Sequence, residues 1–97
     1  MIKKGDDIPD ARWRPSPDIA SRKVADEVVL LNVKTSDYYS MNPTAVFVWE
    51  SLCRNTPLSE IIGDLAAEFG IDAAKARKDV LELIKTLESQ KIISRSA

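Results

Sequence analysis

The residues that could carry chemistry are few, and their spacing matches no familiar catalytic or metal-binding arrangement. The sequence contains no histidine, the side chain that most often serves as a general base or transition-metal ligand near neutral pH. Cys53 is its only cysteine, whereas a structural zinc site needs several Cys or His ligands. The three glycines are too far apart for a phosphate-binding loop. We therefore expect a protein that is not an enzyme, with no catalytic residue, no metal and no cofactor.

Length and charge narrow the class of protein further. A chain of 97 residues has room for one domain, and its 44% apolar and 30% charged residues argue against disorder. The net charge of −1 gives no basic excess, so we expect no nucleic-acid partner. We also expect no membrane contact and no signal peptide, because the sequence lacks a long apolar run and an apolar N-terminal stretch. The single cysteine fits a reducing compartment, which predicts a cytoplasmic protein.

Residues 1–18 are expected to form an extended N-terminal arm, and residues 19–97 a single domain. The arm contains three prolines and mixed charges, which disfavour regular helix. Trp13 is the large apolar residue of this segment, and we expect it to sit as a lid on the edge of the core. The arm is thus predicted to be partly mobile.

Three strands and then three helices follow in the predicted order. We expect strands at 20–24, 27–33 and 38–41, because these short runs are apolar or β-branched and polar turn residues separate them. Helices are expected at 43–53, 57–69 and 73–90, where Asn42-Pro43, Thr56-Pro57 and Asp72 mark the starts and Gly70 marks a stop. Residues 92–93 could add a small β segment. The prediction is a small α+β, winged-helix-like domain in the order β-β-β-α-α-α, with an antiparallel sheet packed on the helices.

Apolar periodicity assigns most large side chains to the core. Trp49 lies on the apolar stripe of the first helix, so we expect it to be buried against the sheet and the third helix. Phe47 points away from that stripe and is expected either to pack under the arm or to make an exposed contact.

A candidate binding site combines the third strand with the third helix. The strand, Tyr38, Tyr39, Ser40 and Met41, carries no charge and no proline, so an exposed edge there could accept an added strand. By helical phase, the wall of the groove would be formed by four residues beside the core stripe: Arg77, Leu81, Ile84 and Lys85. The alternative is that these tyrosines and this helix face serve packing and solvation alone.

Several segments together resemble the PqqD family. The resemblance spans residues 12–93 and is carried by Arg14-Pro15-Ser16-Pro17, Val28-Val29-Leu30-Leu31, Tyr38-Tyr39-Ser40-Met41-Asn42, Trp49-Glu50-Ser51-Leu52 and Asp79-Val80. Met41 stands where the pattern commonly has Leu, a swap that conserves volume.

The resemblance implies a function as well as the same layout of strands and helices. Members of this family are peptide chaperones that bind the leader segment of a ribosomally made precursor peptide and present it to a modifying enzyme. In that family, the leader adds antiparallel to the third strand and rests against the third helix. The implied partners are therefore a precursor peptide and a modifying enzyme such as a radical SAM or lasso-forming enzyme, and the chain would be a monomer or weak homodimer.

Two other functions stay open at this point. A winged-helix DNA-binding protein would use basic residues of the third helix, but three acidic residues share that helix and the hairpin before the third strand has one lysine. Binding to DNA should weaken steeply with salt, whereas strand addition with apolar anchors should not. A scaffold or dimerisation domain with no peptide ligand is the second alternative.

Overall fold

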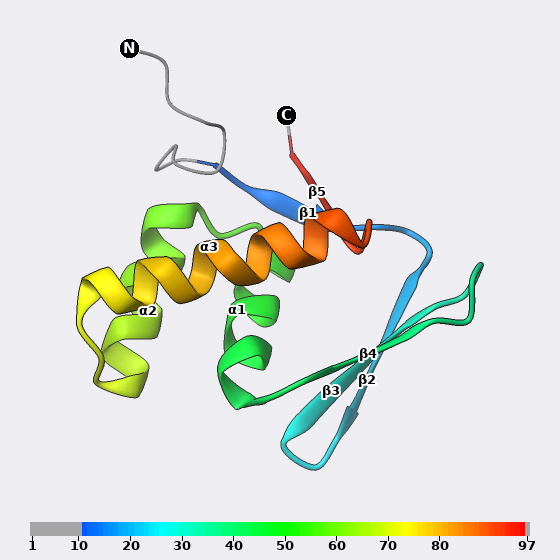
Figure 1. Cartoon of the computed structure of the whole chain (residues 1–97), viewed down its shortest axis with the longest axis horizontal. Helices are drawn as coiled ribbons and strands as arrows, with labels where there is room; N and C mark the ends of the chain where they lie inside the picture. Colours follow the sequence, from blue (N-terminus) through cyan, green and yellow to red (C-terminus); the bar gives the residue numbers. More distant parts are fainter. Residues whose placement is uncertain (1–10, 97) are drawn as a thin grey trace.

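The computed structural model describes residues 11–96 and arranges them as five strands and three helices (Figure 1). Their order is β1 (Trp13–Pro15), β2 (Ile19–Val24), β3 (Glu27–Asn32), β4 (Tyr38–Met41), α1 (Pro43–Cys53), α2 (Leu58–Phe69), α3 (Ala73–Ser89) and β5 (Ile93–Arg95). Strands β2, β3 and β4 form an antiparallel sheet in that order, while β1 pairs with β5 in a second, smaller sheet. The predicted α+β fold class is confirmed.

The hairpin that joins β3 to β4 sets the register of the sheet. Asn32 accepts hydrogen bonds at its side-chain Oδ1 from the backbone N–H groups of Lys34 and Thr35, at 2.9 and 3.1 Å. Its own backbone N–H donates to the carbonyl of Asp37 at 2.9 Å. This closes the turn so that Leu30 lies opposite Tyr39 and Val28 opposite Met41. Because side chains alternate between the two faces of a strand, these four residues share one face of the sheet.

The helices begin and end where the sequence signals predict, within two residues. The Asn42 side chain accepts a hydrogen bond from the N–H of Ala45, and that of Asp72 from the N–H of Lys75, each at 2.9 Å. Gly70 ends α2 with a φ of 62°, in the left-handed region that glycine adopts without a Cβ penalty. No helix within residues 11–96 is long and apolar enough to cross a membrane.

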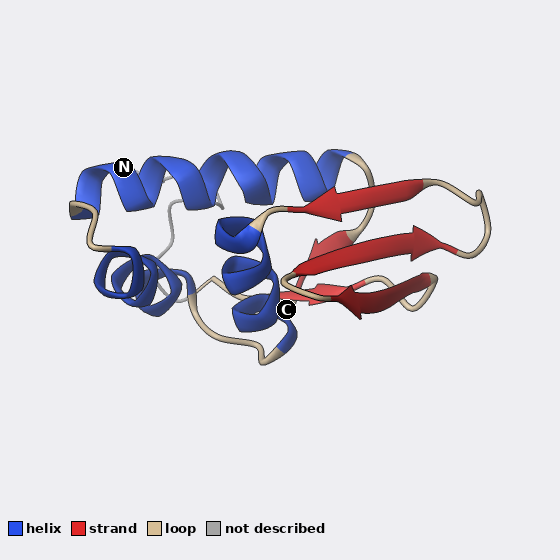
Figure 2. Cartoon of the chain, turned by 90° about the horizontal axis from the view of Figure 1, so that it is seen from below, coloured by secondary structure: helices blue, strands red, loops and turns tan. Residues whose placement is uncertain are grey.

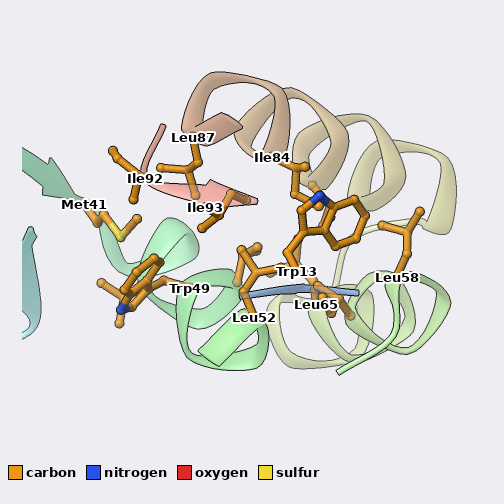
Figure 3. Close-up of a cluster of buried hydrophobic side chains, with 14 of the residues drawn as sticks. Trp13, Met41, Trp49, Leu52, Leu58, Leu65, Ile84, Leu87, Ile92 and Ile93 are labelled. Atoms are coloured by element: carbon orange, nitrogen blue, oxygen red, sulfur yellow. The ribbon is translucent and has the colours of Figure 1, made fainter. Parts of the chain in front are cut away.

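One core joins the inner face of the sheet to all three helices (Figure 3). Val28, Leu30 and Met41 are buried from the sheet side, and the α3 residues Ile84 and Leu87 have no exposed surface. Trp49 is buried as predicted, with 4% of its surface exposed. In Figure 3 it lies beside Met41, on the sheet side of the core. The Trp13 indole is bound to α3 through a hydrogen bond to Glu88.

The expected place of Trp13 on the edge of the core is wrong. Trp13 has no exposed surface, and its strand β1 pairs with β5, opposite Arg95. Its indole Nε1–H donates to Glu88 Oε2 of α3 at 2.8 Å, and the Arg95 guanidinium lies 5.1 Å from its ring centroid. Residues 11–15 of the predicted arm are therefore built into the domain. Residues 1–10 of that arm lie outside the part of the chain that the structure describes.

Phe47 is a packing residue. Its ring meets that of Phe69 edge to face, with centroids 5.8 Å apart and planes at 89°. This geometry is favourable for aromatic pairs and ties α1 to the end of α2. Phe69 stays 39% exposed, so the pair closes the outer side of the contact between the two helices.

Candidate functional site

Strand β4 is an open edge of the three-stranded sheet, as its predicted role requires. It pairs with β3 on one side, and no other described strand pairs with it (Figure 2). Figure 2 shows β4 as the strand of this sheet nearest α3.

The register shows which backbone groups face the open side. The backbone bond from Asn32 to Asp37 makes these two residues a hydrogen-bonded pair of the antiparallel ladder. Hydrogen-bonded and non-bonded pairs alternate along such a ladder, so Tyr39 and Met41 direct their N–H and C=O groups toward β3. Tyr38 and Ser40 therefore direct theirs toward the open edge. On the far side of β3, the bond from the Val33 N–H to the Asp18 carbonyl, at 2.9 Å, fits the same alternation.

The side chains of β4 divide between two faces. Tyr38 is 74% exposed and Ser40 is exposed, both on the outer face of the sheet. Tyr39 is half-buried, and Met41 is 2% exposed on the face that packs on the helices. Met41 therefore offers little to a ligand, because its backbone N–H and C=O groups face β3 and its side chain belongs to the core.

The other edge of the sheet, β2, is built differently. It carries Arg22 and Lys23, and Lys23 Nζ lies 3.7 Å from Glu50 Oε2 of α1. Charged side chains are a common protection of edge strands against unwanted pairing, and β4 has none. The difference favours β4 as the edge that accepts another chain.

A groove of about 340 Å³ lies beside the end of β4, between α1 and α3. It is lined by Asn42, Thr44, Ala45, Val48, Leu65, Asp79, Glu82, Leu83 and Thr86. Its α3 residues recur at positions i, i+3, i+4 and i+7, which places them on one stripe of the helix. Apolar side chains form part of the lining, and the carboxylates of Asp79 and Glu82 give it acidic character. Lys75 Nζ pairs with the Asp79 carboxylate at 3.1 Å. The Glu82 carboxylate forms no ion pair among the described residues.

The predicted helix wall lies on the other flank of α3. At 100° per residue, Arg77, Leu81 and Lys85 fall on the side of the buried stripe that is opposite to the groove residues. Glu88 belongs to the same flank and bonds Trp13, so that flank faces β1. Ile84 is completely buried and offers no surface to a ligand. The α3 residues that line the groove, Asp79, Glu82, Leu83 and Thr86, form a parallel stripe that the sequence analysis did not single out.

A second cavity, of about 400 Å³, lies at the beginning of β4. Its lining combines residues of the sheet and its hairpin with residues that follow α3: Ile19, Leu30, Asn32, Asp37, Tyr38, Tyr39, Gln90 and Ile92. Tyr39 and Leu30 lie opposite each other in the sheet, so the cavity opens on the inner face of the sheet. The β4 edge therefore has a hollow near each of its ends.

The described residues offer little for catalysis. Among residues 11–96 no group of three or more His, Cys, Asp or Glu side chains could hold a metal ion. Burial raises the pKa of the Cys53 thiol, and the nearby Glu50 carboxylate raises it further, against a smaller opposing effect of Arg54. A raised pKa keeps the thiol protonated, whereas a nucleophilic cysteine needs a lowered one.

This environment predicts slow alkylation of Cys53. Because the thiolate is the reactive form, a raised pKa lowers the reactive fraction at pH 8 relative to a free cysteine in a short peptide. The Glu50→Gln variant should react faster, since it removes one cause of the shift. Alkylation rates measured by mass spectrometry across pH 7–10 test this. A Cys53 that reacts faster than the peptide would contradict the assignment.

Comparisons with known proteins bear on the family and the fold of this chain. The family model of coenzyme PQQ synthesis protein D (PqqD) matches residues 27–93. No curated protein matches the sequence. Two solved structures share the fold. One, TbiB1 in complex with the TbiA(beta) leader peptide, has a TM-score of 0.80 at 24% identity and covers 87% of this chain and 98% of its own. The other, lasso peptide synthetase B1 complexed with the leader peptide, has a TM-score of 0.81 at 21% identity and covers 87% and 99%. With the family model matching more than half of its length, the chain belongs to the PqqD family.

Proposed function

We propose that this protein is a non-catalytic peptide-binding module that binds the leader segment of a ribosomally made precursor peptide and presents the peptide to a modifying enzyme. The observation that carries the proposal is the open, uncharged edge of β4 with a hollow near each end. Membership of the PqqD family supports it, and both solved structures of the same fold are complexes with leader peptides.

Strand addition explains how a peptide of variable sequence is held. Tyr38 and Ser40 each offer an N–H and a C=O to an incoming strand, so an antiparallel leader would form hydrogen-bonded pairs with both residues. Affinity then comes mainly from the backbone, and the side chains of the leader that point inward supply specificity.

The two hollows favour different leader side chains. An antiparallel leader passes the Met41 end of β4 first and the Tyr38 end last. Its earlier inward side chains would meet the groove with the Glu82 carboxylate, which suits a long side chain with a cationic end. A later inward side chain would meet Tyr39, Leu30 and Ile92, which suits an apolar group. We infer a leader with a basic residue placed before an apolar one.

The finer partner assignments are part of the same proposal. A radical SAM or lasso-forming enzyme would be the modifying partner, and the complex would act in the cytoplasm. The proposed site is the β4 edge, residues Tyr38–Met41, together with the groove stripe of α3. Arg77, Leu81 and Lys85 would contribute only if the leader also crossed to the β1 side of the helix.

The test is a fluorescence-anisotropy titration with a labelled leader peptide, taken from a short precursor peptide sought among the neighbouring genes. Saturable binding with a weak salt dependence is expected, because apolar anchors and backbone bonds are not screened by salt and only one ion pair, to Glu82, would be. Chemical-shift changes should concentrate on β4 and on the groove stripe of α3. Binding of duplex DNA that weakens steeply with salt, with no leader binding, would instead indicate a DNA-binding protein.

A matched pair of leucines on α3 separates the two flanks of the helix. Leu83 and Leu81 are both half-buried, but Leu83 lines the groove and Leu81 lies on the opposite flank. Leu83→Asp places a carboxylate on an apolar groove surface and should weaken leader binding by about tenfold or more. Leu81→Asp should bind like the unmodified protein. Both variants are measured in the same titration, with thermal unfolding as a check on folding. Loss of binding only in Leu81→Asp would restore the flank predicted from the sequence.

A further inference from the structure

The outer face of the three-stranded sheet is apolar and exposed. Its side chains alternate with those of the core face, and a shallow hollow of about 570 Å³ on it is lined by Ala20, Ser21, Arg22, Val24, Val29, Leu31 and Tyr38. Val24 is 55% and Tyr38 is 74% exposed. Every residue of this lining belongs to a strand, so no described helix forms part of it. The largest apolar patch on a protein surface is often a place where a partner binds.

The charges on this face are balanced. Arg22 on β2 lies opposite Val29, and Glu27 on β3 lies opposite Val24, so the two charged residues are diagonal neighbours on the same face. Neither forms an ion pair with a described residue. A face that carries one cation and one anion has no net charge with which to select an acidic or a basic partner. It is complementary to a copy of itself, because a twofold axis brings residue i of one copy to residue j of the other and j to i.

We propose that two copies of this chain associate face to face through the outer surface of the β2–β3–β4 sheet. The apolar residues Val24, Val29 and Leu31 meet across the twofold axis, and Arg22 of each copy pairs with Glu27 of the other. Stacked sheets pack about 10 Å apart through their side chains. The contact uses a face and leaves the β4 edge open, so each copy keeps its peptide site.

The size of the face predicts weak association. Strands β2 and β3 have six residues each and β4 has four, so at about 4.8 Å spacing and about 3.4 Å rise they cover roughly 260 Å² of flat sheet. The uneven surface of the side chains adds to this area, but the total stays below the ~800 Å² that each partner buries in a standard interface. The dimer should therefore populate at high micromolar concentration and dissociate on dilution.

Charge reversal tests the pairing without any peptide, so its result is independent of the proposed function. Sedimentation velocity is measured from micromolar to millimolar protein. The unmodified chain should shift from monomer to dimer. Arg22→Glu and Glu27→Arg should each raise the dissociation constant about tenfold or more, because each places like charges opposite one another. The double variant Arg22→Glu/Glu27→Arg should restore the original constant. Lys78→Glu on α3 is the matched control and should leave it unchanged.

Three results would overturn the proposal. A chain that stays monomeric up to millimolar concentration has no such interface. Single reversals that dimerise like the unmodified chain place the contact elsewhere. A dimer that Ser40→Pro abolishes while the charge reversals leave it intact pairs through the β4 edge instead of the outer face.

Discussion

Ser40→Pro should remove leader binding while leaving the fold intact. The Ser40 N–H faces the open edge of β4, so proline at this position breaks no hydrogen bond to β3. It does remove a donor to the incoming strand and places its ring where that strand would lie. An unsatisfied leader carbonyl costs about 1–3 kcal/mol, which alone is about tenfold or more in affinity. The measurement is the anisotropy titration, and circular dichroism and thermal unfolding report on the fold.

The chain provides a closely matched control on the opposite edge of the sheet. By the same alternation of bonded pairs, Ser21 of β2 directs its N–H away from β3. Ser21→Pro is therefore the same substitution at an outward-facing position of the other edge strand. It should bind the leader like the unmodified protein. If Ser40→Pro binds normally and Ser21→Pro does not, the peptide adds to β2 and the proposed site is on the wrong edge.

The local parts of the structure could be predicted from the sequence because their signals are local. Asn42-Pro43 and Asp72 mark helix starts through side-chain bonds to N–H groups three residues away, and Gly70 marks a stop through its own backbone angle. The strand at 38–41 and its lack of charge are equally visible in the sequence. That this strand is an edge follows from counting strands in a small sheet.

Features that depend on contacts between distant segments could not be predicted in this way. Trp13 is buried because β1 pairs with β5, about eighty residues later, and no pattern within residues 1–18 records that pairing. On α3, the stripe that contains Leu81 and the stripe that contains Leu83 flank the buried face symmetrically. Periodicity identifies the buried face but cannot say which flank lies toward β4, because that depends on how α3 crosses the sheet. Ile84, predicted for the wall, is completely buried, in keeping with its helical phase at the border of the buried stripe.

Trp13→Ala should cause the largest loss of stability of any single change considered for this protein. The indole has no exposed surface and links three elements: its strand pairs with β5, its Nε1–H bonds Glu88 of α3, and Arg95 lies against its ring. Truncating a buried tryptophan to alanine costs about 3–5 kcal/mol. Small domains have a total stability of about 5–15 kcal/mol, so this loss leaves the folded state marginal.

Trp13→Phe separates the two contributions to that loss. Phenylalanine keeps most of the aromatic packing but has no N–H to donate, which leaves the half-buried Glu88 carboxylate without this partner. Its cost should be about 1–3 kcal/mol, the range for losing one partner of a buried hydrogen bond. The free energies of unfolding come from urea titrations of both variants. They can be compared if the dependence of the free energy on urea concentration, the m-value, is the same for each. A midpoint for Trp13→Ala equal to that of the unmodified chain would show that β1 does not close the core. Because Tyr39 shares a cavity with Ile92, which lies next to β5, closure of the core by β1 and β5 should also hold one end of the proposed peptide site in place.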